Sequence, residues 1–333
     1  TPGTTVQVPQ PKSPVGTITF VVPTVPSGVG LNRAQAPESY MYLGITEQLF
    51  RPQGDELVGP WLATDWQIAP DFSQATITIR SGVQFHKGWG ELTAHDIAWS
   101  ANDTNAAITP TSIHGQAGDL AAFLGEARAT DDRTLVLPFI APEPRWNTLL
   151  FNQAGDSFGV FPKRAFDEMG EDWMRENIIG TGPFQVLEWV KDDRAVLEAL
   201  PQHWDAVPKF KQLRMLAIPE ASGRVAMMET GEADIASTLP LKDVQALVNK
   251  GFKVTSSGRQ TGIPVNFAGN YWEETAAKTG QPLDHPTMVN DIPWIGNPFS
   301  PNDSNNPQGI DDMEQARLVR WALAMAIDRD LAV

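Results

Sequence analysis

Alternation of apolar and polar positions predicts β-strands in the first half of the chain and again near its middle. Residues 16–22 form an apolar, β-branched run that is typical of a buried strand. Residues 66–68 and 75–80 predict a hairpin, because apolar side chains recur at alternate positions of the second segment. A second hairpin is predicted from the alternating segments 184–190 and 194–200.

Other segments have the spacing of helices. Residues 40–50 place apolar side chains at helical spacing, and residues 166–177 are typical of an acidic surface helix. Thr93 is followed three residues later by Asp96, a capping-box pattern that predicts the start of a helix. The buried face of that helix is expected to contain Ile97, Ala98 and Ala101.

The segment from residue 213 to residue 249 alternates strands with helices. Strands are predicted at 213–218 and 233–236, and helices at 221–230 and 241–249. Each helix is followed by a glycine, the residue that most often ends a helix. This β-α-β-α order predicts an α/β layer.

The last part of the chain combines a long irregular stretch with a closing helix. Residues 266–310 are rich in Asn, Pro and Gly and too long for an ordinary connection, so we expect a functional loop or a crossover between lobes. Residues 311–331 predict a helix with Asp311 and Glu314 in capping-box register. Both of its faces are apolar, so we expect further chain to cover it.

Composition narrows the possible functions. The chain has 333 residues, enough for about two domains. Its net charge of −15 disfavours binding to nucleic acid. The chain contains no cysteine, so disulfides, thiolate metal sites and cysteine nucleophiles are excluded. Its opening residues, 1–15, are rich in proline and nearly uncharged, which predicts a flexible tether.

One short pattern is shared with serine hydrolases. Residues 155–159 match GxSxG, with Ser157 at the position of the nucleophile. That motif requires a buried strand before the serine and a helix after it, but residues 152–154 are not strand-like and Pro162 interrupts a following helix. We therefore expect a loop. A secreted serine hydrolase is the alternative, and it predicts labelling of Ser157 by a fluorophosphonate probe.

Two glycine-rich segments are similar to phosphate-binding loops but do not match them. Gly28 and Gly30 lack the third glycine of a dinucleotide site, because Arg33 stands in its place. After Gly182, Pro183 removes a backbone donor that a phosphate site would use. Both segments predict turns.

The histidines do not have the spacing of a helical metal site. His86 and His95 are expected to cap elements or to lie on the surface. We predict no catalytic residue, no metal site and no cofactor.

The Asn-rich stretch contains a second kind of candidate residue. Tyr271 and Trp272 lie beside Asn266 and Asn270, and aromatic rings with amides suit a pocket that stacks on and hydrogen-bonds a ligand. An ordinary loop anchored by one buried tryptophan is the alternative.

Several motifs occur in the order found in a known family of transport proteins. They are residues 42–50 and 59–66, residues 77–88 and 92–97, IGTGPF at 179–184, His203-Trp204, GEADI at 231–235, and VRWALAMAIDR at 319–329. Together they resemble the peptide-binding group, family 5, of the extracytoplasmic solute-binding proteins that serve ABC importers. The resemblance runs from about residue 16 to residue 333.

The resemblance implies an α/β, two-lobe periplasmic-binding-protein-like fold of type II, with mixed sheets and an inserted subdomain. Residues 16–40 and 178–265 would form the first lobe, and residues 41–177 the inserted subdomain. Residues 266–333 would begin the second lobe. Most of that lobe has no counterpart here, so we expect the chain to be truncated in it.

The resemblance also implies where a ligand would bind. Matching positions follow the first strand, the GEADI motif and the start of the second lobe, which are carboxyl ends of strands or crossovers. With the aromatic pair, the predicted ligand-binding residues are Thr24, Ser27, Ser237, Thr238, Leu239, Asn266, Asn270, Tyr271 and Trp272.

The sequence therefore predicts a non-catalytic, substrate-binding component of an ABC importer. It would capture a peptide or a similar polar solute between two lobes and deliver it to a membrane permease. An oligosaccharide, an opine or a metal chelate is the alternative ligand. We expect a monomer in the periplasm or on the outer face of the cytoplasmic membrane, attached by lipid through its N-terminal tether.

Overall fold

A computed structural model describes residues 16–35, 39–153, 155, 158–255, 267, 274–275, 280–283, 292–297 and 310–328. The chain divides into two compact units, Thr1–Val254 and Thr255–Val333. The predicted tether at 1–15 lies outside the described residues.

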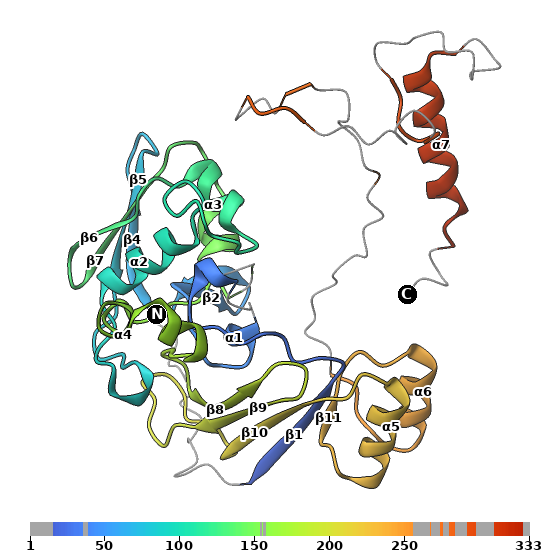
Figure 1. Ribbon diagram of the computed structural model, residues 1–333, viewed down its shortest axis with the longest axis horizontal. Helices are drawn as coiled ribbons and strands as arrows, with labels where there is room; N and C mark the ends of the chain where they lie inside the picture. Colours follow the sequence, from blue (N-terminus) through green and yellow to red (C-terminus); the bar gives the residue numbers. More distant parts are fainter. Residues whose placement is uncertain are drawn as a thin grey trace. The chain divides into compact units, whose positions relative to one another are not determined.

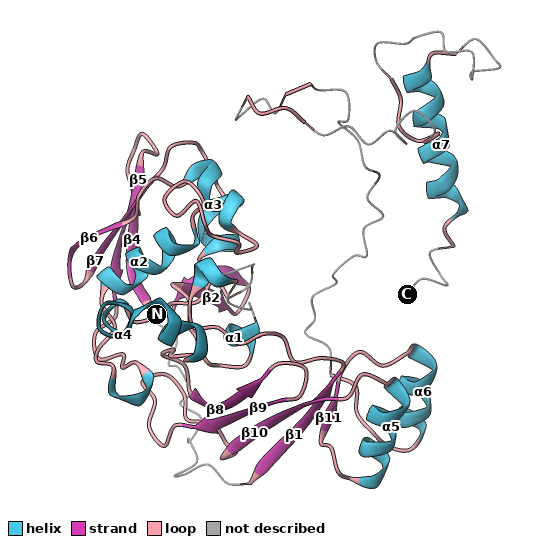
Figure 2. Ribbon diagram, in the orientation of Figure 1, coloured by secondary structure: helices cyan, strands magenta, loops and turns pink. Residues whose placement is uncertain are grey.

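A five-stranded mixed sheet organises part of the first unit (Figures 1 and 2). Its strands are β1 (Thr17–Val22), β8 (Phe184–Val190), β9 (Arg194–Ala199), β10 (Gln212–Ala217) and β11 (Ile235–Ala236). The spatial order is β11-β1-β10-β9-β8. The apolar run at 16–22 and the hairpin of β8 and β9 are confirmed, and the register of that hairpin pairs Phe184 with Ala199.

Strand β1 lies parallel to both of its neighbours, β10 and β11. Val22 pairs with Ala217 on one side, and Val21 pairs with Ala236 on the other. The carboxyl ends of the three strands therefore meet at one edge of the sheet. Helices α5 (Ala221–Thr230) and α6 (Leu241–Asn249) follow β10 and β11 and lie beside β11 (Figure 1).

Residues between β1 and β8 build a second, antiparallel sheet, with the order β4-β5-β7-β6. Its strands are β4 (Ala63–Ile68), β5 (Gln74–Ile79), β6 (Arg128–Asp131) and β7 (Thr134–Pro138), and a separate hairpin pairs β2 (Phe50–Gln53) with β3 (Glu56–Pro60). The predicted hairpin is confirmed, with Trp66 opposite Ile77. Burial alternates along β5, so Ala75, Ile77 and Ile79 face the core.

Helices in this part of the chain are α2 (Ala94–Thr104), α3 (Ala117–Phe123) and α4 (Lys163–Glu176), with shorter helical turns at Asn32–Ala34, His86–Gly88 and Trp146–Leu150. The capping box is confirmed: Asp96 accepts hydrogen bonds from the backbone and the hydroxyl of Thr93, both at 2.8 Å. The predicted buried face, Ile97, Ala98 and Ala101, lies in the core. Helix α4 begins at Lys163, and Gly170, with φ of 81°, interrupts its regular geometry.

The prediction of a helix across 40–50 is wrong beyond its first turn. Helix α1 covers only Ser39–Tyr42. Gly44 then adopts φ of 70°, and its carbonyl oxygen accepts a hydrogen bond from the Phe184 amide at 3.0 Å. The Ile45 carbonyl likewise accepts from the Gly182 amide at 2.9 Å. Pairing with a distant segment therefore replaces the helical hydrogen bonds that the apolar spacing favoured.

The apolar side chains form separate clusters. One gathers residues such as Leu62, Ile77, Ile97 and Phe151 from the four-stranded sheet, its helices and the adjoining loops. A second packs Tyr40, Ile45, Phe161 and others against the five-stranded sheet. The predicted boundaries between the first lobe (16–40 and 178–265) and the inserted subdomain (41–177) stay a prediction.

In the second unit, helix α7 spans Asp312–Ala326. The Asp311 side chain accepts a hydrogen bond from the Glu314 amide at 2.8 Å, so this predicted cap is confirmed. Ala316 is buried, whereas Leu318, Trp321 and Met325 are exposed within this unit.

Candidate functional site

The carboxyl edge of β1, β10 and β11 carries the loops in which ligand-binding residues were predicted (Figure 1). The Ser237 amide donates to the Val21 carbonyl at 3.1 Å, and the Ile218 amide donates to the Val22 carbonyl at 2.7 Å. These bonds extend the pairing past the ends of β11 and β10. The loops 23–30, 218–220 and 237–240 therefore leave the sheet side by side.

The predicted residues in these loops are accessible. Thr24, Ser27 and Thr238 are exposed, and Ser237 and Leu239 are half-buried. The Thr24 hydroxyl donates to Asp192 Oδ1 at 2.9 Å, so the turn between β8 and β9 also reaches this edge. Thr238 has φ of 55°, a left-handed conformation that is uncommon for a β-branched residue. The edge therefore presents hydroxyl groups and irregular backbone in one place, and their role in binding stays a prediction.

Other sequence predictions fall outside the described residues. This is the case for Asn266, Asn270, Tyr271, Trp272 and Ser157. The described residues near Ser157 do not have the strand-turn-helix arrangement of a nucleophile elbow, because residues 158–162 are irregular and helix α4 begins only at Lys163.

Arg224, on helix α5, was missed by the sequence analysis. Its guanidinium is buried at the same edge and donates hydrogen bonds to four backbone carbonyl oxygens. A signal was present in the sequence, because Arg224 is the one charged residue among the small and apolar residues 221–228. A buried charge inside a helix is uncommon unless polar partners surround it.

The prediction that His86 caps an element or lies on the surface is wrong. His86 is buried between backbone groups of the IGTGPF segment: its Nε2 lies 2.8 Å from the Gly182 carbonyl, and its Nδ1 accepts from the Gly180 amide at 3.2 Å. Since a carbonyl only accepts and an amide only donates, the ring is the neutral Nε2–H tautomer. Burial lowers the pKa of His86 to about 4.

Glycines of the same segment allow close approach of two backbones. A Cβ atom on Gly180 would lie 1.9 Å from the Ile45 carbonyl oxygen, and one on Gly182 would lie 2.2 Å from that of Gly44. The segment was predicted to be a turn. It instead fits between residues 44–46 and His86, where only a residue without a side chain has room.

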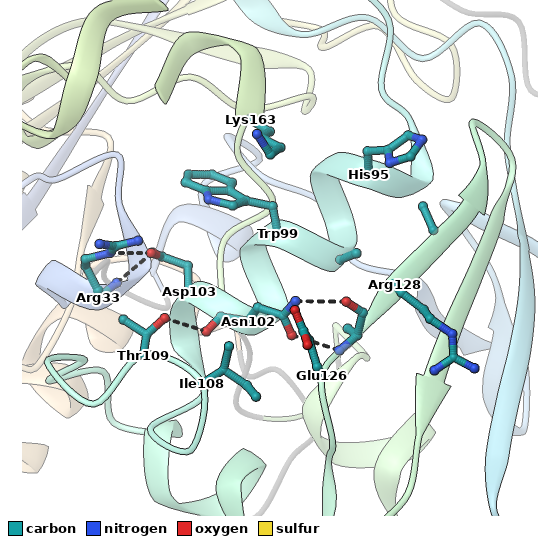
Figure 3. Close-up of a pocket in the computed structure, with 13 residues that line it drawn as sticks. Arg33, His95, Trp99, Asn102, Asp103, Ile108, Thr109, Glu126, Arg128 and Lys163 are labelled. Atoms are coloured by element: carbon teal, nitrogen blue, oxygen red, sulfur yellow. Dashed lines mark hydrogen bonds and ion pairs between the residues drawn. The ribbon is translucent and has the colours of Figure 1, made fainter. Parts of the chain in front are cut away.

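A separate cavity of about 490 Å³ lies over helix α2 (Figure 3). Its lining includes Trp99, Arg33, Lys163 and His95 (Figure 3). Arg33 pairs with Asp103 at 2.5 Å, so this part of the lining is already engaged within the protein. The cavity shares no residue with the loops at the sheet edge.

The described part of the chain shows neither a metal-binding cluster nor a membrane-spanning helix. No group of three or more His, Asp or Glu side chains there could hold a metal ion. In the same residues, no helix is both long enough and apolar enough to cross a lipid bilayer.

Comparison with known proteins gives consistent matches. The family model described as "Bacterial extracellular solute-binding proteins, family 5 Middle" matches residues 58–333. The dipeptide-binding protein of Escherichia coli K12 is 28% identical over 200 residues, which cover 55% of this chain and 36% of that protein.

Solved structures show the same fold. MoaA of A. tumefaciens R10, in complex with mannopinic acid, has a TM-score of 0.61 at 23% sequence identity. The match covers 71% of this chain and 48% of the MoaA chain. DppA of Helicobacter pylori, in complex with the peptide STSA, has a TM-score of 0.60 at 23% sequence identity. That match covers 72% of this chain and 49% of the DppA chain. The chain thus spans about a third to a half of the lengths of the proteins it matches.

Proposed function

Because this chain belongs to the family 5 bacterial extracellular solute-binding proteins, we propose that it is part of the substrate-binding component of an ABC importer. In this proposal it holds a peptide or a similar polar solute, and a membrane permease receives that solute. The observation that carries the proposal is the meeting of three loops at the carboxyl ends of β1, β10 and β11, since open α/β sheets bind ligands at such edges.

Binding at this edge of the sheet would neither form nor break a covalent bond. Hydroxyl groups of Thr24 and Thr238 would hydrogen-bond the solute, and closure of a second lobe would exclude water. Ser27, Ser237, Leu239 and the predicted residues of the 266–272 stretch would complete the contact. Because the chain would only hold and release its ligand, we infer no enzymatic activity.

The relatives support a peptide as the chemical class of the solute. The E. coli relative is named for dipeptides, and the H. pylori structure holds a four-residue peptide, which supports a peptide ligand. The A. tumefaciens structure holds mannopinic acid, so the same fold also accepts a small non-peptide solute. We infer a location outside the cytoplasmic membrane, as the family description states, and propose a monomer attached by a lipid at its N-terminal tether.

Native mass spectrometry of the chain purified from its own source tests the proposal. A co-purified small molecule that leaves on denaturation is the expected result, and its mass identifies the class. The variants Thr24→Val and Thr238→Val should each weaken retention about fivefold, the effect of one lost hydrogen bond. Thr64→Val is the matched control, because Thr64 is exposed on β4, in the other sheet, and its hydroxyl donates to the Thr78 carbonyl. Equal retention by all three variants would contradict the proposed site.

A further inference from the structure

We propose that Arg224 is the positioning residue that holds two ligand-facing loops in the geometry required for binding, an inference that rests on the proposed function. Arg224 lies in the first turn of helix α5, behind the carboxyl edge of the five-stranded sheet. Only 3% of its surface is exposed, so it would act on a ligand through the loops that it holds.

The hydrogen bonds of Arg224 join two loops that are distant in sequence. Its Nη1 donates to the carbonyls of Ile218 and Pro219 at 2.5 and 2.8 Å, in the loop that follows β10. Its Nε and Nη2 donate to the carbonyls of Ser237 and Thr238 at 3.2 and 2.7 Å, in the loop that follows β11. One planar group thus bridges the strands on either side of β1.

This bridge matches the position of the predicted ligand-facing residues. Strand β1 lies between β10 and β11, so the loop that contains Thr24 leaves the sheet between the two loops joined by Arg224. Ser237 and Thr238 are themselves predicted ligand-binding residues, and the bond to Thr238 holds a residue whose φ is 55°. Without this bond, the strained backbone would relax toward commoner conformations, and the hydroxyl groups would lose their fixed positions.

The chemistry of arginine explains why this residue type is needed. A guanidinium has five donors in a fixed plane, and here four of its hydrogen bonds go to backbone carbonyls. Those carbonyls lie past the strand ends, where the sheet provides no partner. Lysine retains the charge but carries its three donors on a single nitrogen atom, so it cannot reach acceptors on both loops with the same geometry.

A set of three variants, made in the full chain, tests this role. Arg224→Met removes the donors and keeps an unbranched apolar stem, and Arg224→Lys keeps the charge. Arg214→Met is the matched control, because Arg214 lies on β10, one of the strands that Arg224 bridges, and its side chain is exposed. The first measurement is amide hydrogen exchange of the free chain at 218–220 and 235–240, with the helix α2 segment 94–104 as an internal reference.

We expect exchange in the two loop segments to rise at least tenfold in Arg224→Met, less in Arg224→Lys, and not at all in Arg214→Met. Exchange in helix α2 should stay unchanged in all three, which separates a local effect from global unfolding. If Arg224→Met does not fold, Arg224→Lys provides the same comparison. Unchanged loop exchange in a folded Arg224 variant would overturn the proposal.

The second measurement is retention of a synthetic pool of dipeptides and tetrapeptides that includes Ser-Thr-Ser-Ala, read by native mass spectrometry. Retention should fall at least tenfold in Arg224→Met and stay at the wild-type level in Arg214→Met. If Arg224→Met shows faster exchange in the two loops but retains peptide at the wild-type level, the positioning role is overturned. If the wild-type chain retains no peptide, the proposed peptide-binding function fails and the ligand-positioning role fails with it, whereas the exchange result still shows whether Arg224 holds the loops.

Discussion

His203 and Glu47 lie together in the interior of the first unit, with Nε2 of the histidine 3.6 Å from Oε1 of the glutamate. Both side chains are almost fully buried, at 3% and 1% exposure. The other oxygen of Glu47 accepts a hydrogen bond from the Trp204 indole at 3.0 Å. Glu47 precedes β2 and His203 precedes β10, so the pair links the segment before the small hairpin to the five-stranded sheet.

The first prediction concerns the protonation of His203. Burial alone would lower its pKa, but Glu47, the Thr181 carbonyl and Asp205 together raise the pKa above its ordinary value of 6.5. Glu47→Gln should therefore lower the pKa of His203, while the amide oxygen of the glutamine can still accept from Trp204. Titration of the histidine ring signals by NMR measures the shift.

The same variant has a consequence for stability. A histidine whose pKa is raised by folding stabilises the protein fully below its unfolded pKa, and this stability is lost as the pH rises through the folded pKa. The wild-type free energy of unfolding should thus fall as the pH rises from about 6.5 through the raised pKa of folded His203, and Glu47→Gln should reduce this fall. A wild-type slope that Glu47→Gln leaves unaltered would contradict the link between the two residues.

His86 should have the opposite dependence on pH. Its pKa is about 4 in the folded chain, because burial disfavours the charged ring, against 6.5 ordinarily. Its contribution is therefore present above pH 6.5 and is lost as the pH falls toward 4. The stability advantage of the wild type over His86→Gln should shrink by about 1.6 kcal/mol between pH 6.5 and pH 5.

Urea unfolding at the two pH values measures this change. Comparing the wild type with the variant isolates His86 from His114, whose pKa burial also lowers to about 4. A constant advantage across this range would show that the ring is already charged in the folded protein.

A third prediction tests the close approach of the IGTGPF segment. Gly180→Ala would place a methyl group 1.9 Å from the Ile45 carbonyl oxygen, which belongs to the backbone and cannot move independently. We expect a loss of about 3 kcal/mol or more in the free energy of unfolding. Thermal and urea unfolding measure it.

Gly118→Ala is the matched control for that substitution. Gly118 lies in helix α3, and a Cβ atom there would meet nothing within 4 Å. Alanine should stabilise this helix by about 0.5–1 kcal/mol. Similar effects of the two substitutions would mean that the segment near Gly180 is less tightly packed than described.

The last prediction separates stability from binding at Thr238. Asparagine tolerates a positive φ better than threonine does, so Thr238→Asn should stabilise the chain by about 1 kcal/mol. Thr238→Val keeps the β-branched shape and should give no such gain. Under the proposed function, both variants should weaken ligand retention, because both remove the hydroxyl group. A gain in retention with either variant would place the ligand elsewhere.

Local patterns were sufficient to predict most elements of the first unit. The β8–β9 hairpin, the cap at Thr93 and the strand at 17–22 depend on residues that are neighbours in sequence, and each formed as expected. The order of motifs also identified the family, because it reflects a whole fold. The helix expected across 40–50 failed because its backbone finds partners near residue 183.

The sequence alone determined where most strands, helices and caps of the first unit form, since these depend on side-chain periodicity and hydrogen bonds between close neighbours. Only the tertiary structure decided which polar groups are buried together. The roles of Arg224 and of the pair of Glu47 with His203 depend on backbone and side-chain partners that folding brings near. A charge enters the interior only where such partners replace water, and that condition is set by packing in three dimensions.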